Sequence, residues 1–415
     1  MSEANIIGTL RIGLIGSGFV AKFHVEALLS VRHVTVSGIY SPNAKHREAL
    51  AQRVNELELG PCQAFPSLEA MLLSGAVDAV WILSPNDTRL ETMREISRLA
   101  GTGKTKLVGV ACEKPLARTL AEAREMLRLA EAAKLLHGYL ENQLFAPALE
   151  RGKEIVWRRA VPFAGRPYLA RATEEHSGPH MPWFWRGVQQ GGGTLLDMGC
   201  HSVEVGRFLL TKPGAPRGEL RLIRVNATVD NLKWTRPEYV ANLKARMGNE
   251  VDYSKRPSED YARSVLTFRD TEGRDVLVEC TNSWAYVGAG LRGTIELLGA
   301  EYAMEYNSLN TSLKVFISRA VGGGGEGEDL VEKQNAEQGL MPVVEDPAGA
   351  LGYVAEDRHV VDALRHGRMP METFADGVAV IEMLMALYLS AELGRVVEMP
   401  AAELETYVPM VAREK

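Results

Sequence analysis

Two short motifs carry side chains that could move a proton. The first is Glu113-Lys114-Pro115, and the second runs from Gly191 to His201 and contains Asp197. A lysine can act in acid–base chemistry where burial or a neighbouring positive charge lowers its pKa toward neutrality. Asp197 and His201 stand four residues apart, so on one helix they would share a face and pair a carboxylate with an imidazole. Taken singly, the motifs also suit a surface lysine, a helix-start aspartate and a core histidine.

A glycine turn near the N-terminus is typical of dinucleotide binding. The stretch Gly16-Ser17-Gly18-Phe19-Val20-Ala21 follows a strand pattern and precedes a helix pattern. The first glycine permits a tight turn, the second lets the backbone approach a pyrophosphate, and the alanine allows close packing of helix and strand. The N-terminus of the helix then faces the anion. We therefore expect cofactor contacts from Gly16, Gly18, Phe19, Val20 and Ala21.

The residues after the second expected strand bear on the choice between NAD and NADP. An acidic residue there would hold the ribose hydroxyl of NAD, but the sequence reads Tyr40-Ser41-Pro42-Asn43. Ser41 and Arg47, with Lys45, could hold a 2′-phosphate instead, or the basic side chains could lie on a solvated helix face. We expect NAD or NADP, with Ser41 and Arg47 beside the adenosine ribose.

The N-terminal third alternates strand and helix patterns. Strands are expected at residues 10–15, 34–39, 79–83 and 107–112, and helices at residues 20–31, 44–57, 88–100 and 119–136. This alternation predicts an α/β fold with right-handed crossovers, a doubly wound parallel sheet of the Rossmann type. Ligands of such sheets bind outside the carboxyl ends of the strands, where Lys114 would stand.

The second half lacks regular intervening helices and predicts an open sheet. Strands are expected at residues 169–173, 220–227, 261–268, 276–280 and 294–298, followed by helices at 353–365 and 376–393. The polar, basic stretch 230–259 and the glycine-rich stretch 321–328 have the composition of excursions from this sheet. We expect two domains, residues 1–142 and 143–415.

Composition excludes several protein classes. The chain has 415 residues, of which 46% are hydrophobic and 24% charged, so disordered and fibrous proteins are excluded. A net charge of -6 gives no basic face for nucleic acid or an anionic membrane. The apolar stretch 378–393 contains Glu382 and falls short of the roughly 20 uninterrupted residues of a membrane span. The four cysteines form no CxxC pair and the N-terminus lacks a basic signal region, so we expect a cytoplasmic protein.

In this order along the chain, the motifs resemble those of the Gfo/Idh/MocA oxidoreductase family, which includes glucose-fructose oxidoreductase and inositol dehydrogenase. The resemblance runs through GLIGSGFVAKFHVEAL, SPN at 84–86, EKP at 113–115, GGGTLLDMGCHSVE and GRVVEMP. It implies a Rossmann domain followed by an α+β domain, whose open, mainly antiparallel sheet forms a homo-oligomer interface.

The same resemblance implies roles for individual residues. Gly16, Gly18 and Ala21 would hold the pyrophosphate, and Lys114, Asp197 and His201 would line the reaction centre. One departure is Arg89, which stands where the family often has a histidine. The residues expected near the nicotinamide end of the cofactor are Ser84, Pro85, Asn86, Arg89, Glu113 and Lys114.

The segment before Gly191 suggests a sugar site. Aromatic rings can stack on the apolar faces of sugars while histidine and arginine side chains bind hydroxyl groups. The alternative is that the tryptophans are core anchors. His176, His180 and Glu175 also suggest metal ligands, but no fourth ligand accompanies them and no metal is expected. The candidate substrate residues are His176, His180, Trp183, Trp185 and Arg186.

These features favour an NAD(P)-dependent dehydrogenase of a secondary alcohol in a sugar, polyol or sugar derivative. Lys114, assisted by His201, would take the hydroxyl proton as hydride leaves for the cofactor, and Asp197 would orient the pair. The alternative, by analogy with family relatives, is an NAD-dependent glycosidase that oxidises its sugar transiently, eliminates the glycosidic substituent, adds water and returns the hydride. A third hypothesis is a nucleotide sensor, which would not need Lys114, Asp197 and His201 together.

Overall fold

A computed structural model describes residues 6–248, 251, 253–317 and 339–413 of the chain. The chain divides into two compact units. The first unit comprises residues 1–147 and 351–381, and the second comprises residues 148–350 and 382–415. Residues 351–381 thus belong with the N-terminal residues, whereas a single boundary at residue 142 would assign them to the second domain.

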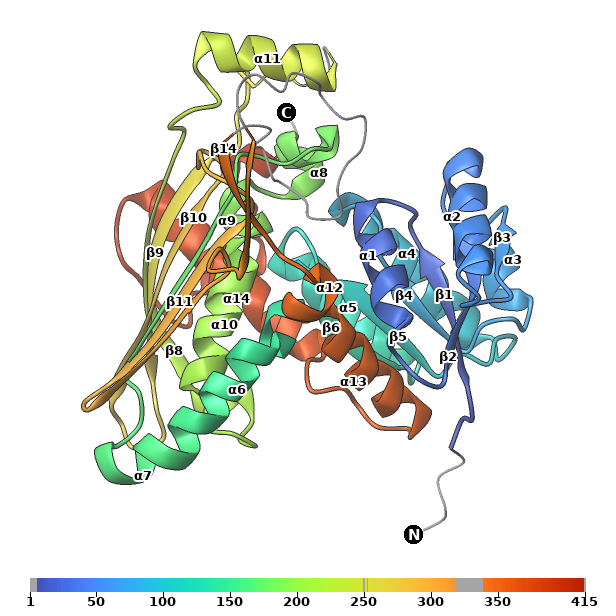
Figure 1. Cartoon of the computed structure of the whole chain (residues 1–415), viewed down its shortest axis with the longest axis horizontal. Helices are drawn as coiled ribbons and strands as arrows, with labels where there is room; N and C mark the ends of the chain where they lie inside the picture. The colour runs from blue at the N-terminus through green and yellow to red at the C-terminus, as the bar shows by residue number, and fades with distance from the viewer. Residues whose placement is uncertain (1–5, 249–250, 252, 318–338, 414–415) are drawn as a thin grey trace. The chain divides into compact units, whose positions relative to one another are not determined.

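The first unit is built on a six-stranded, wholly parallel sheet with the strand order β3-β2-β1-β4-β5-β6 (Figure 1). Its central strands β1, β4 and β5 are mostly apolar and almost fully buried, as expected of a parallel sheet covered on both faces. The predicted α/β Rossmann architecture is confirmed. The strands are β1 (Leu10–Ile15), β2 (Val34–Tyr40), β3 (Gln63–Phe65), β4 (Ala79–Ile82), β5 (Gly109–Glu113) and β6 (Leu136–Leu140).

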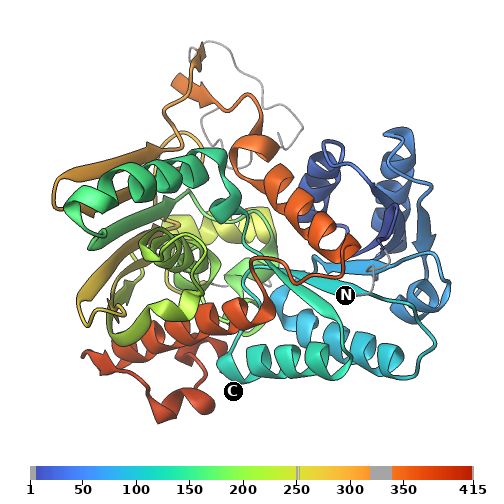
Figure 2. The same ribbon diagram turned by 90° about the horizontal axis from the view of Figure 1, so that it is seen from below.

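Helices cover both faces of this sheet (Figure 2). Three helices share one core cluster on one face: α1 (Phe19–Leu28), α2 (Ala44–Glu56) and α13 (Tyr353–Arg365). The other face carries α3 (Leu68–Leu73), α4 (Asn86–Gly101) and α5 (Leu120–Ala132). The expected helix at 119–136 therefore ends early, because Lys134 adopts a left-handed conformation with φ of 54° and β6 begins two residues later.

The second unit contains a seven-stranded sheet with the order β12-β11-β7-β10-β9-β8-β15. All its neighbouring pairs are antiparallel except β7 with β10, so the expected open, mainly antiparallel sheet is confirmed. A separate antiparallel pair is formed by β13 (Leu313–Ile317) and β14 (Gly339–Val343). The sheet strands are β7 (Leu169–Glu175), β8 (Arg221–Asp230), β9 (Tyr261–Arg269), β10 (Asp275–Ser283), β11 (Arg292–Gly299), β12 (Tyr302–Asn307) and β15 (Val397–Glu398).

Helix α10 (Gly199–Leu210) is buried along its whole length and packs against β7 and β10. Helix α6 (Pro147–Ile155) lies beside it, where Lys153 Nζ donates a hydrogen bond of 2.6 Å to the carbonyl of Phe208. The shorter helices of this unit are α7 (Val161–Ala164), α8 (Gly187–Gln190), α9 (Thr194–Asp197) and α12 (Pro347–Ala350).

The long C-terminal helix α14 (Phe374–Leu393) spans the break between the two units at residue 381. It begins four residues before the apolar stretch seen in the sequence, and by length and composition alone its 20 residues are long and apolar enough to cross a membrane. The expectation that this stretch is too short is therefore wrong. Because 67% of its apolar 18-residue segment is buried within the protein, α14 has the character of a core helix.

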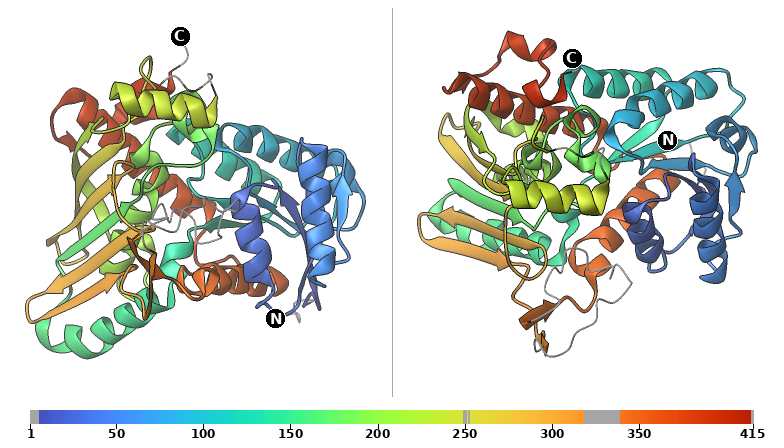
Figure 3. Two further views of the ribbon diagram at one scale, coloured as in Figure 1. Left: turned by 45° about the horizontal axis from the view of Figure 1, so that its top comes forward. Right: turned by 90° about the horizontal axis from the view of Figure 1, so that it is seen from above.

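The stretch 230–259 is more ordered than its polar composition predicts. It contains α11 (Pro237–Met247), drawn in yellow-green in Figure 3. Trp234, Val240 and Leu243 from this stretch join Trp185 and Trp284 in a buried cluster, so its apolar residues form core. The glycine-rich stretch 321–328 lies outside the described residues.

Candidate functional site

In the first unit, the turn between β1 and α1 suits a dinucleotide. Gly16 has a φ of 123°, and a Cβ atom there would stand 2.7 Å from the carbonyl oxygen of Leu83. Gly18 is the N-cap of α1, and a Cβ atom there would meet nothing within 4 Å. The first turn of α1, which holds Phe19, Val20 and the buried Ala21, carries no acidic residue. These features fit the pyrophosphate of NAD, because the N–H groups at a helix N-terminus attract an anion.

Arg47 hydrogen-bonds to the backbone that follows β2. Its Nη1 donates hydrogen bonds to the carbonyl oxygens of Ser41 and Pro42, at 3.1 and 3.3 Å. Ser41 itself is buried, with 8% of its surface exposed. The guanidinium group of Arg47 is therefore committed in part to the backbone, and its contact with the adenosine ribose stays a prediction.

Lys114 follows directly after β5, at the carboxyl end of the sheet, and is partly buried. Its neighbour Glu113 is 2% exposed and contacts Nε2 of His24 at 3.3 Å. The other ring nitrogen of His24 lies 2.9 Å from Asp357, which also accepts a hydrogen bond of 3.0 Å from the indole of Trp81. A buried network thus links α1, β5, β4 and α13 beneath Lys114.

The charges in this network follow from its geometry. Burial disfavours a charged His24, but Asp357 and Glu113 on its two sides raise its pKa well above the usual value. Burial likewise disfavours a charged Glu113, and the hydrogen bond with His24, together with the nearby Lys114 and Arg89, lowers its pKa. The core of the network is therefore an imidazolium held between two carboxylates.

Arg89 holds the backbone around Lys114. Its Nε donates to the carbonyl of Ser84 at 2.9 Å, and its Nη1 donates to the carbonyls of Glu113 and Pro115. Only 4% of Arg89 is exposed. The departure noted in the sequence therefore positions the Glu113–Pro115 turn, while direct contact of Arg89 with a cofactor stays a prediction. Pro85 is the N-cap of α4 and Asn86 is its buried first residue.

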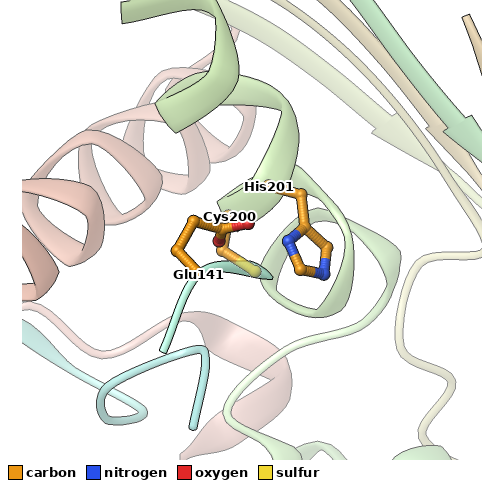
Figure 4. A group of neighbouring side chains, drawn as sticks. All are labelled: Glu141, Cys200 and His201. Carbon is orange, nitrogen blue, oxygen red and sulfur yellow. The ribbon is translucent and has the colours of Figure 1, made fainter. Parts of the chain in front are cut away.

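In the second unit, Asp197 and His201 lie on successive short elements. Asp197 ends α9, Met198 interrupts the helix, and α10 begins at Gly199. The two residues therefore lie on two successive helices rather than on one. His201 follows Cys200 on α10 and is 4% exposed, and both side chains are labelled in Figure 4.

Asp197 is contacted by two side chains that directly follow strands of the sheet, His176 after β7 and Trp284 after β10. The indole Nε1 of Trp284 donates to Asp197 Oδ2 at 3.2 Å, and Nε2 of His176 lies 3.9 Å from the same oxygen. The N–H of Gly178 donates to Nδ1 of His176, which places the proton of the neutral imidazole on Nε2. His176 is fully buried, so the structure brings it to Asp197.

The aromatic segment divides into buried and partly exposed residues. Trp185 is 3% exposed and contacts Trp234, Tyr253 and Trp284, so it is a core anchor, and its assignment to sugar stacking is wrong. Trp183 stacks on Phe184 with ring centroids 3.8 Å apart and is partly exposed. His180 is partly exposed and Arg186 is exposed, and their contacts with a substrate stay predictions.

Sequence reasoning missed a buried carboxyl group beside the glycine run. Glu259 Oε1 accepts hydrogen bonds from the N–H groups of Gly193 and Leu195 and from the hydroxyl of Tyr388. Burial raises the pKa of Glu259 to about 7, against the lowering effect of these hydrogen bonds. No local pattern signals this contact, since Glu259 and Tyr388 are 129 residues apart.

Two family models match the chain. One, described as an oxidoreductase family with an NAD-binding Rossmann fold, matches residues 10–139. The other, described as the GFO/IDH/MocA C-terminal domain, matches residues 163–305. The two matches fall on the two sheets described above.

Individual proteins of known sequence or structure are also similar to the chain. The chain is 28% identical over 201 residues to the rhizopine catabolism protein MocA of Rhizobium meliloti, a match that covers 48% of this chain and 56% of that protein. It is 23% identical over 399 residues to the D-apiose dehydrogenase of Paraburkholderia graminis, covering 94% of this chain and 90% of that one. The crystal structure of GenD2 from gentamicin A biosynthesis, in complex with NAD, superposes with a TM-score of 0.75 at 25% identity, covering 95% of this chain and 98% of that one. The chain thus spans about half the length of the MocA protein that it matches.

Proposed function

Because the chain belongs to the GFO/IDH/MocA oxidoreductase family, we propose that it is an NAD-dependent dehydrogenase acting on a secondary alcohol of a sugar, polyol or sugar derivative. The observation that carries this proposal is the parallel sheet of the first unit. Its Gly16 turn suits a dinucleotide, and Lys114 stands at the carboxyl end of the same sheet, where ligands of such folds bind. A sugar substrate is supported by relatives such as the D-apiose dehydrogenase.

The chemistry divides between cofactor and protein. Bound NAD supplies a carbon that accepts hydride from the substrate. In its neutral form the Lys114 amine accepts the proton of the substrate hydroxyl, so that a C–H bond and an O–H bond break and a carbonyl group forms. His201 assists this proton transfer, and Asp197 orients the pair. Trp284 and His176 hold Asp197 in turn.

NAD is the cofactor that we propose, rather than NADP. The hydrogen bonds from Arg47 to the carbonyls of Ser41 and Pro42 occupy part of the guanidinium that a 2′-phosphate would need. The GenD2 structure, solved with NAD, supports the same choice. Titration of the protein with NAD and NADP, followed by protein fluorescence, tests it: tighter binding of NADP would contradict it.

We also propose a cytoplasmic homo-oligomer that associates through the second sheet. The four cysteines are free thiols, as in proteins of a reducing compartment. One face of the sheet packs α10, while Arg171, Glu279 and Glu296 form ion pairs on exposed positions of β7, β10 and β11. Light scattering coupled to gel filtration measures the mass, and Arg171→Glu should reduce it. A monomeric wild-type protein would contradict this proposal.

The experiment for the catalytic assignment replaces Lys114. Lys114→Ala should lower the turnover number by roughly 100-fold or more, since a positioned acid or base contributes about that much. NAD affinity, measured by calorimetry, should stay near the wild-type value. Lys104→Ala is the matched control, because Lys104 is an exposed lysine of the same unit. Near-normal turnover of Lys114→Ala would contradict the assignment.

The redox-neutral glycosidase is not favoured, because the D-apiose relative is named a dehydrogenase. Stoichiometry separates the two activities. A dehydrogenase forms one NADH for each substrate molecule oxidised, whereas a glycosidase cycle forms product with only catalytic NAD.

A further inference from the structure

Two residues bind every backbone N–H at the start of the turn that carries Asp197. Four N–H groups at the beginning of any helix lack partners within the helix. At α9, the N–H groups of Gly193 and Leu195 donate to Glu259 Oε1 at 3.0 and 2.9 Å, and that of Thr194 donates to the carbonyl of Glu259 at 3.0 Å. The hydroxyl of Tyr388 accepts from Gly193 and from Leu196, at 3.1 and 3.2 Å. The same hydroxyl lies 2.5 Å from Glu259 Oε1, so the two side chains also hold each other.

The glycines of this loop are matched to the same two residues. A Cβ atom at residue 192 would stand 2.1 Å from the hydroxyl of Tyr388, and one at residue 193 would stand 2.2 Å from the carbonyl oxygen of Glu259. Glycine is therefore needed at both positions by close approach. The glycine run of the sequence, which suggests close approach to a ligand, here approaches the protein's own side chains.

The segment that carries Glu259 also reaches the side chain of Asp197. The carbonyl of Asp260 accepts a hydrogen bond of 2.8 Å from the N–H of Trp284. The indole of Trp284 donates in turn to Asp197 Oδ2. Glu259 and its neighbour thus fix both the backbone before Asp197 and the donor to its carboxylate. Glu259 is 5% exposed and Tyr388 is 2% exposed, so water cannot easily replace these bonds.

We propose that Glu259 and Tyr388 form a positioning pair that sets the place of Asp197 and of His201 beyond it. The inference rests on the proposed function, because it takes Asp197 and His201 as members of the reaction centre. Neither Glu259 nor Tyr388 is a catalytic residue in this proposal. Their hydrogen bonds keep the Gly193–Leu196 backbone in one conformation, and small displacements of reacting groups are costly to turnover.

The kinetic test removes each partner. Tyr388→Phe and Glu259→Ala should lower kcat by roughly 10- to 100-fold, the range expected when a reacting group is misplaced by about an ångström. NAD affinity should not change, because the glycine turn of the first unit is untouched. Tyr407→Phe is the control, since it removes another buried phenol hydroxyl of the second unit, one that interacts with Glu392. Glu259→Gln keeps an oxygen acceptor in place, so it should restore most of the kcat that Glu259→Ala loses.

A second measurement separates this proposal from the proposed function. Hydrogen exchange of the Gly193–Leu196 amides, measured by mass spectrometry without substrate, should become faster in Tyr388→Phe and in Glu259→Ala but not in Tyr407→Phe. A wild-type protein without dehydrogenase activity would refute the proposed function, whereas unchanged exchange in both variants would refute the positioning pair. Faster exchange with unchanged kcat would also overturn it, and so would a Glu259→Gln variant as impaired as Glu259→Ala.

Discussion

Replacing His24 by phenylalanine should destabilise the first unit, because it leaves two buried carboxylates without their shared cation. Glu113 is 2% exposed and Asp357 is 0% exposed, at 3.3 and 2.9 Å from the two ring nitrogens of His24. Removing one partner of a buried ion pair costs about 3–5 kcal/mol, because the remaining charge stays desolvated. We expect His24→Phe to lower the free energy of unfolding by that amount at neutral pH.

The sign of the pH dependence provides a second check on His24. Its pKa is raised in the folded protein, so its stabilising contribution is fully present below its unfolded pKa and is lost only as pH rises through the raised value. In His24→Phe the carboxyl group of Glu113 should acquire a raised pKa instead, because burial is no longer opposed by the cation. The deficit of the variant should therefore shrink as pH falls from about 7 toward about 4, where carboxyl groups become neutral.

Urea unfolding followed by circular dichroism at several pH values measures both effects. His137→Phe is the matched control, because His137 is a buried histidine of the same unit whose pKa is lowered mainly by burial. It donates no charge to a carboxylate and accepts one hydrogen bond of 3.0 Å, from the N–H of Phe374. The control should lose about 1 kcal/mol. Equal losses in the two variants, or a His24→Phe deficit that does not vary with pH, would refute the charged network.

Three further changes give distinct expected results. Arg89→Lys cannot reproduce the fork that binds three carbonyl oxygens, so turnover should fall by about 10-fold or more; Arg94→Lys, an exposed arginine of the same helix, should not change it, and equal turnover in the two variants would argue against the fork. Gly16→Ala places a Cβ atom 2.7 Å from the carbonyl of Leu83, so NAD affinity measured by calorimetry should fall, whereas Gly75→Ala, at another positive φ but in open space, should bind NAD normally. The pKa of Glu259 rises from 4.5 to about 7, so wild-type stability should decline as pH rises across that range, by about 3 kcal/mol at most. Glu259→Gln should flatten this decline in urea unfolding, and an unchanged slope would show that Glu259 does not titrate there.

Much of the fold could be predicted because its signals are local. The apolar run of β1 and the amphipathic pattern of α13 give observed bounds equal to the expected ones. The failures also have physical causes. β3 has only three residues, too few for a periodic signal. The end of α5 cannot be recognised in the sequence, because the residue that takes the left-handed conformation after it is Lys134, where glycine is usual.

The site was predictable only where its residues lie together in sequence. Lys114 and Asp197 stand in recognisable motifs, but the groups that hold them do not. Asp357 reaches the network below Lys114 from 333 residues beyond His24, and Trp284 reaches Asp197 from 87 residues away. Trp185 shows the opposite error, since its place in an aromatic segment suggested a sugar platform while tertiary packing buries it.

The two units hold their proposed reacting groups by different physical means, and this difference predicts which unit loses stability first as pH rises. Lys114 stands above an imidazolium between two carboxylates, an arrangement that persists until His24 loses its proton at a pH well above its usual pKa. Asp197 depends on Glu259, whose buried carboxyl group accepts hydrogen bonds from uncharged donors, the N–H groups of Gly193 and Leu195 and the hydroxyl of Tyr388. Since burial raises the pKa of Glu259 to about 7, its stabilising contribution is lost as pH rises toward that value, whereas His24 keeps its proton to a higher pH, so the second unit should weaken before the first. Amide exchange around Gly193 should therefore accelerate at a lower pH than exchange in β5, after correction for the intrinsic effect of pH.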